Sequence, residues 1–558
     1  MFENDRKELA NLIFPDVKLT VSDLEAKYPN RNLPENAMVT RFAPSPTGFL
    51  HTGSLFTSLI AWKFAKQSNG VFYIRLEDTD TKREIEGSGE SLLKELAKFN
   101  IINDEGYYGT HEEGNYGPYK QSDREGLYRV VIKEMIENDL AYPCFCSSED
   151  LAKLREKQEQ DKIIPGYYGE FASCRFLSPR EAIEKIQNGE PYIIRFKSRG
   201  NHNNKEHFSD LIRGELDLAQ NDQDIVILKS DGLPTYHFAH LVDDHFMHST
   251  HITRGEEWLS SAPIHIELFR AMGWEAPKYA HLPVIMKLDN GNRRKLSKRK
   301  DSEAAVSFFL QEGYPTEGFI EYLLTIANSN YEEWRKENPN ASSDEFMLSF
   351  NKMSLDGALF DLDKVKFICK ELISKMKTVE IVEASTKWAK IYSPELLALI
   401  EENPEMYSQI LSIEREQEKP RKDYAKYSDI YPAITFFYDK FYNTYLNEKV
   451  LPWNENFSKE DIKLVLETYA KTINLELDQE EWFNTIKELA SSLGFAANVK
   501  DYKKNKEAYK GHVGDISEMI RIAVSTSKQS PNLYFVLKIL GKDKVIERLQ
   551  KTINTLIE

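Results

Sequence analysis

The sequence is poor in cysteine and in long hydrophobic runs. Four cysteines in 558 residues are too few for a disulfide framework, which favours a reducing setting. No apolar run approaches the ~18 residues that a membrane helix needs. The first six residues, Met-Phe-Glu-Asn-Asp-Arg, lack the basic-then-apolar order of a secretory signal. We therefore expect a cytoplasmic protein that makes no use of a membrane.

An excess of positive charge is also absent. The net charge of -16 excludes a protein that coats nucleic acid through bulk attraction, although basic residues gathered on one face remain compatible with an RNA enzyme. Two basic concentrations occur, in residues 287–300 and 500–510. Such runs are more often solvated surface than RNA contacts. A chain of this length predicts several domains.

A strand–helix–strand unit is predicted near the start of the chain. Residues 38–43 and 71–76 are apolar and predict two short strands. Leu55, Leu59 and Trp62 recur at helical spacing between them, so a helix should begin near Gly53 or Ser54. Strand, helix and strand joined by short links form a βαβ unit, the start of a parallel sheet.

The rest of the chain divides by pattern. A second block of the same kind is predicted near residues 224–228 and 279–286, and residues 142–216 between the blocks mix polar helix with short strands, as an insertion does. Beyond about Lys370 the pattern is helical, including a helix up to Thr472 that Ser458 would cap.

The first chemical motif lies between the first strand and the first helix. Arg-Phe-Ala-Pro-Ser-Pro-Thr-Gly at residues 41–48 leads into His51, Gly53 and Ser54. Ligands of doubly wound sheets bind beyond the carboxyl ends of strands, and helix N-termini there favour phosphate. Gly53 lets a nucleotide approach the backbone, and His51 can donate to a phosphate oxygen. Alone, His-x-Gly-Ser is more often a simple helix cap.

The second motif is a pair of lysines on a loop. Lys295, Ser297 and Lys298 follow an Asp-Asn-Gly-Asn turn at residues 289–292. A mobile cationic loop of this kind can close over a triphosphate and stabilise charge as pyrophosphate leaves. Seen alone it is more often a solvated basic turn. Together, in this order, the two motifs resemble the two signatures of class I aminoacyl-tRNA synthetases.

Four segments narrow the resemblance to glutamyl-tRNA synthetases of the bacterial type. They are residues 41–48 above, Arg-Leu-Glu-Asp-Thr-Asp at 75–80, Asp-Gly-Leu-Pro-Thr-Tyr-His at 231–237 and Arg-Gly-Glu-Glu-Trp at 254–258. The resemblance is close from residue 38 to about 300 and looser beyond. The related glutaminyl enzymes usually carry Pro-Glu-Pro-Asn-Gly in the first segment and end in β-barrels, whereas this C-terminal third is predicted to be helical.

The resemblance implies an α/β fold. A Rossmann-like catalytic domain with a parallel sheet carries an inserted acceptor-binding domain and is followed by an all-α anticodon-binding region. The expected divisions are an N-terminal extension (1–37), the first catalytic half (38–141), the acceptor-stem insertion (142–223), the second catalytic half (224–290), the Lys-Leu-Ser-Lys-Arg loop with a stem-contact domain (291–370) and the anticodon-binding domain (371–558).

By the same resemblance, one set of residues holds L-glutamate: Arg41, Ala43, Ser45, Glu77, Tyr236 and Arg254. An arginine fork matches a carboxylate in two parallel hydrogen bonds, which would select glutamate over glutamine. Glu77 could receive the α-ammonium. Where the family often has asparagine, this chain has His240, whose hydrogen bonding would be pH-sensitive.

The implied reaction is a two-step ligation of L-glutamate to tRNA(Glu). ATP enters with Mg²⁺, a glutamyl-adenylate forms with loss of pyrophosphate, and the terminal ribose of the tRNA then accepts the glutamate. His51, Lys295 and Lys298 are the expected catalytic residues. The expected ATP-binding residues are Gly53, Ser54, Glu257, Trp258 and Lys298. We expect a monomer that needs bound tRNA for activation.

Three cysteines fall inside the insertion. Cys144, Cys146 and Cys174, with Tyr167 as the nearest fourth ligand, match a zinc site found in some members of the family. Three reduced cysteines in a small core need no metal, so a zinc site and a metal-free cluster stay open.

Other functions also stay open at this point. A tRNA-modifying glutamyl transferase would resemble only the catalytic half, and a small-molecule nucleotidyltransferase would need neither the arginines nor the C-terminal third. A catalytically dead RNA-binding relative would have lost His51 or Lys298. Whether tRNA(Gln) is also charged, and which side chains read the anticodon, does not follow from the sequence.

Overall fold

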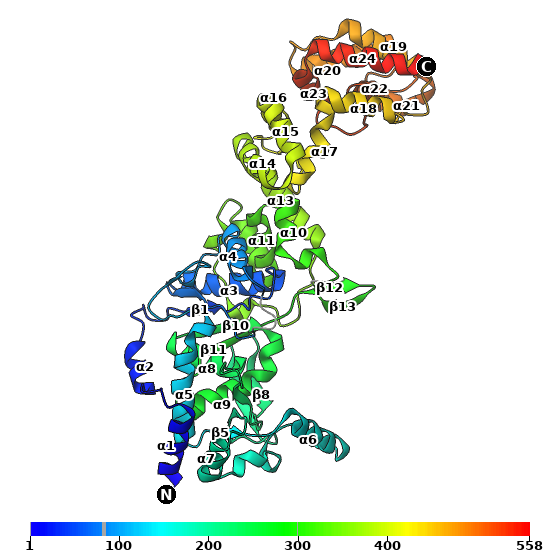
Figure 1. Cartoon of the computed structure of the whole chain (residues 1–558). Coiled ribbons are helices and arrows are strands. Elements are labelled where there is room, and N and C mark those ends of the chain that lie inside the picture. The colour runs from blue at the N-terminus through cyan, green and yellow to red at the C-terminus, as the bar shows by residue number, and fades with distance from the viewer. Residues whose placement is uncertain (1, 81–84, 298, 558) are drawn as a thin grey trace. The chain divides into compact units, whose positions relative to one another are not determined.

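The computed structural model describes residues 2–80, 85–297 and 299–557 (Figure 1). The chain forms two compact units. Residues 1–309 with 320–361 make the first, and residues 310–319 with 362–558 make the second. The finer domain divisions expected from the sequence stay a prediction.

A parallel sheet in two halves forms the centre of the first unit. Its strands are β1 (Val39–Phe42), β2 (Val71–Ile74), β3 (Glu105–Tyr107), edge strand β4 (Glu112–Glu113), β10 (His251–Gly255) and β11 (Lys278–Leu282). The β1, β2 and β3 strands pair in parallel, as do β10 and β11. Helices α3 (Thr52–Gln67) and α9 (Ala262–Met272) connect β1 to β2 and β10 to β11. The predicted α/β fold with a parallel sheet is confirmed.

The two halves meet at β1 and β10 (Figure 1). The amide of Thr250, just before β10, donates to the carbonyl of Val39 at 3.0 Å. The strand order is therefore β3-β2-β1-β10-β11, with the chain winding in opposite directions from the central pair. In open parallel sheets this reversal opens a crevice at the carboxyl ends of the two strands, and ligands bind there.

Local sequence explains the first half of the sheet. The turn before β2 uses Asn69, which has a φ of 53°, and Gly70, where an added Cβ would lie 2.0 Å from the carbonyl oxygen of Met38. Helix α3 begins at Thr52, slightly earlier than predicted, because the side chain of His51 caps it. Apolar side chains of α3 such as Leu55 and Leu59 are buried against the sheet.

The second half differs from the prediction in one strand. Residues 224–228 do contain β9 (Val226–Leu228), but β9 pairs antiparallel with β6 (Ile193–Phe196), which pairs in turn with β5 (Ala141–Cys144). The strand beside β11 is β10, which the apolar pattern missed because His251, Thr253 and Arg254 interrupt it. Arg254, one of the predicted glutamate-binding residues, thus lies on a strand that the sequence did not predict.

The insertion and the flanking segments complete the first unit. These elements are α6 (Ser148–Gln160), α7 (Pro179–Gln187), the hairpin β7 (Lys205–Asp210) and β8 (Gly214–Ala219), the hairpin β12 (Met286–Asp289) and β13 (Asn292–Lys295), and α12 (Tyr331–Glu337). Strand β7 extends the second half-sheet by pairing with β11. Asn290 and Gly291 have positive φ in the predicted turn between β12 and β13.

Helices of the first unit pack around the sheet. They are α1 (Phe2–Ile13), α2 (Val21–Lys27), α4 (Ser88–Lys98), α5 (Glu125–Glu137) and α8 (Tyr236–Phe246). Leu9 and Ala10 of α1 are buried in the same core as Val131 of α5 and Phe238 of α8. Helices α10 (Val306–Glu312) and α11 (Thr316–Ala327) each contain a boundary between the two units.

Every regular element that the structure describes in the second unit is helical, which confirms the predicted all-α C-terminal region. They are α13 (Leu362–Lys375), α14 (Thr378–Tyr392), α15 (Pro394–Glu402), α16 (Pro404–Ser412), α17 (Ile430–Ile434), α18 (Asp439–Glu448), α19 (Lys459–Thr472), α20 (Gln479–Ser492), α21 (Val499–Lys504), α22 (Val513–Ser525), α23 (Leu533–Leu540) and α24 (Lys542–Ile557). Ser458 caps α19 as predicted, accepting from the amide of Asp461 at 3.1 Å. One apolar core runs through these helices.

Candidate active site

One cavity of about 1260 Å³ opens at the carboxyl ends of β1 and β10. The predicted site residues that line it are Arg41, Ala43, Ser45, His51, Gly53, Ser54, Glu77, Tyr236, Arg254, Glu257, Trp258 and Lys295. Residues from both halves of the sheet and from widely separated motifs therefore share one space. Lys298, expected to be catalytic and to bind ATP, lies outside the described residues.

His51 is held at the N-terminus of α3. Its Nδ1 accepts a hydrogen bond from the amide of Gly53 at 2.9 Å, and its carbonyl accepts from Ser54 at 2.8 Å. An accepting Nδ1 in a neutral imidazole leaves the ring proton on Nε2. The imidazole of His51 and the positive end of the helix dipole thus lie at one wall of the cavity, which suits an anion.

The segment after the lysine loop packs against the His51 loop. The amide of Val306 donates to the carbonyl of Leu50 at 3.1 Å, and the hydroxyl of Thr52 donates to the carbonyl of Glu303 at 2.8 Å. The segment directly after the second motif therefore lies beside the first motif, although the two are distant in the sequence.

Carboxylates pair with Lys295 and Arg294 of the β12–β13 hairpin. Lys295 Nζ lies 3.2 Å from Oε1 of Glu257, a pair formed by two of the predicted residues. Arg294 donates to both carboxylate oxygens of Asp301 at 2.6 and 2.8 Å, which holds the pKa of Asp301 well below its usual range. The amide of Ser297 also donates to Asp301, at 2.9 Å. Asp301 therefore ties down the described part of the predicted mobile loop.

Arg41 lies in a buried network of charges. Its Nε donates to Oδ1 of Asp244 at 3.1 Å, and Arg75 Nη1 donates to the same oxygen at 3.0 Å. Arg75 also donates to Glu77 at 3.1 Å. Burial opposes ionisation of Asp244, but Arg41 and Arg75 hold its pKa well below the usual range. For Glu77 burial dominates and raises the pKa above its usual value, against the attraction of Arg75 and Arg41.

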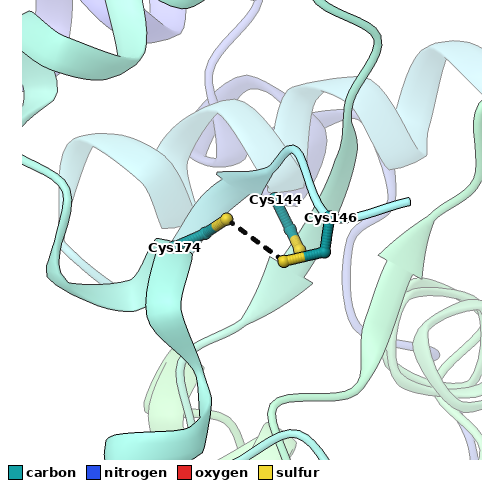
Figure 2. Close-up of side chains that lie close together, drawn as sticks. All are labelled: Cys144, Cys146 and Cys174. Atoms are coloured by element: carbon teal, nitrogen blue, oxygen red, sulfur yellow. Dashed lines mark hydrogen bonds between the residues drawn. The ribbon is translucent and has the colours of Figure 1, made fainter. Parts of the chain in front are cut away.

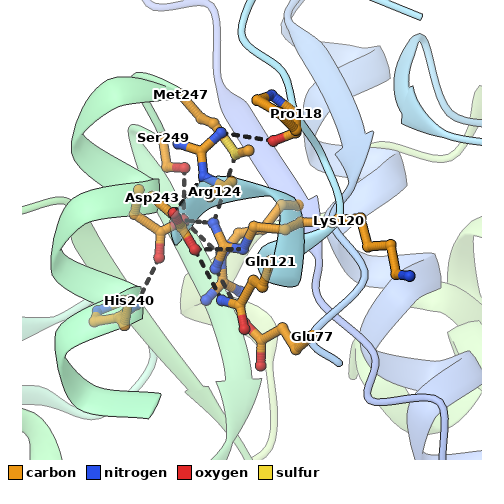
Figure 3. A network of polar contacts seen from close by, with 12 residues as sticks. Glu77, Pro118, Lys120, Gln121, Arg124, His240, Asp243, Met247 and Ser249 are labelled. Atoms are coloured by element: carbon orange, nitrogen blue, oxygen red, sulfur yellow. Dashed lines mark hydrogen bonds and ion pairs between the residues drawn. The ribbon is translucent and has the colours of Figure 1, made fainter. Parts of the chain in front are cut away.

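A second aspartate of α8 extends this network below the cavity. Figure 3 shows Gln121 and Arg124 converging on Asp243, with His240 and Glu77 at the ends of the network. Asp243 accepts from Arg124 Nε at 2.6 Å and from Gln121 Nε2 at 2.8 Å. Buried charges are stable only when paired in this way, so the network fixes the floor of the site.

Arg254 has different neighbours. Its Nε donates to Nε2 of His281 at 3.0 Å, Nη1 to Nδ1 of His265 at 3.0 Å, and Nη2 to the carbonyl of Trp258 at 3.4 Å. The guanidinium also lies over the ring of Tyr279, 4.7 Å from its centroid.

Two aromatic rings form another wall. The rings of Tyr236 and Trp258 have centroids 4.3 Å apart. Tyr236 begins α8, and Trp258 lies three residues after the end of β10, so both rings come from the part of the chain that carries the second half of the sheet.

His240 does not behave as expected. It does not line the cavity but lies fully buried, with Nδ1 2.5 Å from Oδ2 of Asp244 and Nε2 2.9 Å from the hydroxyl of Tyr279. Burial lowers its pKa to about 4 despite the attraction of Asp244. The imidazole is therefore neutral near pH 7, and its protonation is pH-sensitive only in the acid range.

The three cysteines of the insertion form a compact cluster (Figure 2). The sulfur atoms of Cys144, Cys146 and Cys174 all lie within 4.8 Å of one another. The hydroxyl of Tyr167 lies 3.5 Å from Sγ of Cys144 and 3.3 Å from Sγ of Cys146. The predicted four ligands thus converge: the three thiols are ligands that tetrahedral zinc sites use, and Tyr167 adds an oxygen.

Sequence reasoning did not identify the residues behind the cavity wall. They are Asp210, Asp243, Asp244, His265 and His281, which are all buried; Asp244 contacts the predicted Arg41, and His265 and His281 contact the predicted Arg254. His237 and His240, three residues apart on α8, were the available signal of a histidine-lined interior. Nothing in the sequence connects them to His265 and His281, because that contact depends on how α8, α9 and β11 pack.

No helix in the described ranges has the length and apolar character to cross a membrane. Residues 37–366 match the family model of the catalytic domain of class I tRNA synthetases (E and Q), and residues 416–553 match an anticodon-binding domain model.

The chain is 47% identical to a glutamate–tRNA ligase of Clostridium perfringens over 98% of this chain and 99% of that protein. It is 39% identical to one of Sorangium cellulosum over 97% and 99%. A crystal structure of a glutamate tRNA ligase from Elizabethkingia meningosepticum, in complex with its amino acid, has 28% identity and a TM-score of 0.74, covering 93% of this chain and all of that one. With two domain models in the predicted order and matches along almost its whole length, the chain belongs to the glutamate–tRNA ligase family of class I aminoacyl-tRNA synthetases.

Proposed function

We propose that the chain ligates L-glutamate to tRNA(Glu) with ATP, through a glutamyl-adenylate, in the cavity at the β1–β10 junction. One observation carries the proposal: a single cavity is lined by the N-terminus of α3, which suits phosphate, by the rings of Tyr236 and Trp258, and by two buried arginines. Family membership gives the class of reaction. The cavity contains cationic groups for carboxylates and phosphates and aromatic rings beside them, which this reaction requires.

The glutamate subsite lies on the arginine side of the cavity. Arg254 and Arg41 provide cationic groups for carboxylates, and Glu77 provides an acceptor for the α-ammonium. Ala43, Ser45 and Tyr236 complete the subsite. The raised pKa of Glu77 falls again when an ammonium binds, because the new positive charge favours the carboxylate.

The nucleotide subsite lies on the α3 side. The imidazole of His51 and the N-terminus of α3 at Gly53 and Ser54 form the phosphate side of the subsite, and Lys295 adds a positive charge. Glu257 and Trp258 belong to the same subsite, and Lys298 is included on the resemblance alone. ATP enters as its magnesium complex, whose cation offsets part of the triphosphate charge. The protein orients the attacking carboxylate and stabilises charge on the phosphates, which is where such catalysis gains most.

The tRNA would contact both units. Unpaired anticodon bases suit aromatic stacking and edge contacts, and the anticodon-binding model matches the helical unit. The insertion would hold the acceptor stem. We further propose that the protein acts as a monomer in the cytoplasm, where its four free cysteines would stay reduced.

Pyrophosphate exchange tests the proposal. With ATP, Mg²⁺ and glutamate the purified chain should exchange pyrophosphate only when tRNA(Glu) is present, and glutamine should not replace glutamate. Exchange with glutamine alone would contradict the amino-acid assignment. Transfer of glutamate to a tRNA that lacks its 3′-terminal adenosine would indicate the tRNA-modifying rival, because no ester to the terminal ribose can then form.

We propose that Cys144, Cys146, Cys174 and Tyr167 hold a structural zinc ion. The bonds from the backbone support this arrangement, since the amide of Cys174 donates to the Tyr167 hydroxyl at 3.1 Å and the amide of Phe145 to Cys174 Sγ at 3.4 Å. Zinc would tie β5 to the segment around Cys174 and fix the insertion.

Metal analysis of protein purified without chelator tests this site. One zinc per chain is expected, lost in Cys146→Ala and retained in Cys369→Ala, a buried cysteine of α13 far from the cluster in sequence. The assignment would be overturned if the wild-type protein contained no metal and added zinc changed neither its unfolding midpoint nor the reactivity of its thiols toward a thiol reagent.

A further inference from the structure

Arg254 is the arginine of the cavity with neutral acceptors. Arg41 donates to the carboxylate of Asp244, as does Arg75 beneath it. The described acceptors of Arg254 are two imidazoles and a carbonyl. All three arginines are buried, so the contrast is not one of exposure to water.

The first imidazole is fixed from behind by a carboxylate. Nδ1 of His281 lies 2.6 Å from Oδ2 of Asp210, which also accepts the His281 amide at 3.1 Å. The amides of Ile212 and Arg213 donate to the other oxygen of Asp210 at 3.0 and 2.9 Å. Nδ1 of His281 therefore carries the proton, and Nε2 presents a lone pair to Arg254.

The second imidazole is oriented by another histidine. A guanidinium only donates, so Nδ1 of His265 must accept from Arg254. The proton of His265 then lies on Nε2, 2.9 Å from Nδ1 of His237. Both imidazoles must be neutral for these contacts to exist. Burial supports this, lowering the pKa of His265 far below its usual value and lowering the pKa of His281 and His237 as well.

Two donors of Arg254 then stay available to the cavity. A guanidinium has five N–H groups, and the bonds above use one on Nε, one on Nη1 and one on Nη2. The second N–H of Nη1 and of Nη2 has no acceptor among the residues that the structure describes. One hydrogen from each terminal nitrogen is the pair that a carboxylate accepts in parallel.

We propose that His265 and His281 are positioning residues that hold Arg254 rigidly without neutralising it, and so set the selection of a carboxylate side chain over a carboxamide. The inference rests on the proposed function, because it assumes that glutamate binds in this cavity. A carboxylate in either position would fix Arg254 as firmly, as Asp244 does for Arg41. It would also cancel the charge that distinguishes glutamate from glutamine.

The test is a pair of nearly isosteric substitutions at His265. In His265→Asn the amide oxygen stands near the Nδ1 position and accepts from Arg254 without charge. In His265→Asp a carboxylate takes that place. The measured quantities are kcat, the KM of glutamate, the KM of ATP and the ratio of kcat/KM for glutamate over glutamine.

The inference predicts a split between the two variants. His265→Asn should keep the glutamate KM within about threefold of the wild type. His265→Asp should raise the glutamate KM by roughly 30-fold or more. It should lower the ratio of kcat/KM for glutamate over glutamine by a similar factor, because the new carboxylate neutralises the charge of Arg254 that distinguishes the two substrates. The KM of ATP should stay within about twofold in both, which a general loss of structure would not allow.

His281→Gln and His281→Glu form a second pair, in case His265→Asp does not fold. The Gln oxygen reaches the Nε2 position and accepts from Arg254, so the same split is expected. His245→Asn and His245→Asp are the matched controls. His245 is partly buried on α8 and stacks on Trp274 with ring centroids 3.7 Å apart, outside the cavity lining. Its two variants should give equal glutamate KM values.

Equal glutamate KM values for the Asn and Asp variants of His265, both folded, would overturn the inference while leaving the proposed function intact. A wild-type protein that activates no glutamate would overturn the proposed function first. A split as large in the His245 pair as in the His265 pair would also overturn the inference, because any new carboxylate in this unit would then have the same effect.

Discussion

The two halves of the parallel sheet each place an arginine at the cavity and surround it in different ways. Arg41 on β1 belongs to a network in which Asp244 also serves Arg75. Arg254 on β10 contacts two neutral imidazoles. Both arginines line the cavity, but Arg41 shares its charge with a buried carboxylate, whereas Arg254 has no carboxylate partner among the described residues. The difference lies in the acceptors, because a guanidinium keeps its charge in both settings.

Arg254→Gln should have the largest effect on catalysis. It removes the uncompensated charge, so kcat/KM for glutamate should fall by about 10³-fold, in the range of a lost buried charge pair. Stability should change little, because the neutral partners of Arg254 are left without an orphaned charge. Steady-state pyrophosphate exchange and thermal unfolding of the same preparation give both numbers. A large loss of stability would make Arg254 a structural residue like Arg41.

Arg41→Gln should show the reverse balance. The change leaves Asp244 with one arginine fewer in a buried site, which should lower the free energy of unfolding of the first unit by about 3 kcal/mol. Glutamate binding should also weaken, but with a visible fall in unfolding temperature. If Arg41→Gln unfolds at the wild-type temperature, the contrast between the two arginines fails.

His240→Asn should reduce the loss of unfolding free energy that the wild-type protein shows as the pH falls below about 6.5. The pKa of His240 is about 4 in the folded protein, below its unfolded value near 6.5, so the unfolded chain binds more protons between those pH values. The folded state is fully favoured above pH 6.5 and loses about 3 kcal/mol as the pH falls to 4. Denaturant unfolding at pH 7 and pH 5, in wild type and variant, measures the difference. An unchanged pH dependence in the variant would place the acid sensitivity elsewhere.

Glu257→Gln should have the smallest effect. Its pair with Lys295 is exposed, and such pairs add little stability, so the unfolding temperature should stay within about 1 °C. Released from Glu257, Lys295 would meet the phosphates with less competition, while an ATP contact of Glu257 would be lost. We expect the KM of ATP to change by a few fold and the KM of glutamate not to change. An effect confined to glutamate would contradict the division of the cavity.

The first half-sheet and the helix after His51 could be predicted from the sequence, whereas strand β10, which carries Arg254, and the buried side chains that contact the site could not. The apolar runs around β1 and β2 and the helical spacing after His51 predicted the first half-sheet, since burial on both faces leaves a clear pattern. Strand β10 was missed, because three polar side chains interrupt its single buried run. The pocket residues came from motif resemblance, and the cavity unites those that the structure describes.

The residues that contact Arg254 show why the rest of the site could not be predicted from the sequence. Asp210, His265 and His281 come from β7, α9 and β11, and no spacing rule relates them. Their function depends on which nitrogen of each imidazole faces the guanidinium, a property of packing alone. The burial of His240, which moves its titration into the acid range, was invisible in the sequence for the same reason.

A crystal structure with a non-hydrolysable glutamyl-adenylate analogue tests the central claim most directly. The account predicts the side-chain carboxylate within hydrogen-bond distance of Nη1 and Nη2 of Arg254, with the Arg254 contacts to His265 and His281 unchanged and the phosphate at the N-terminus of α3. An analogue whose side chain points away from Arg254, or one bound outside this cavity, would contradict it.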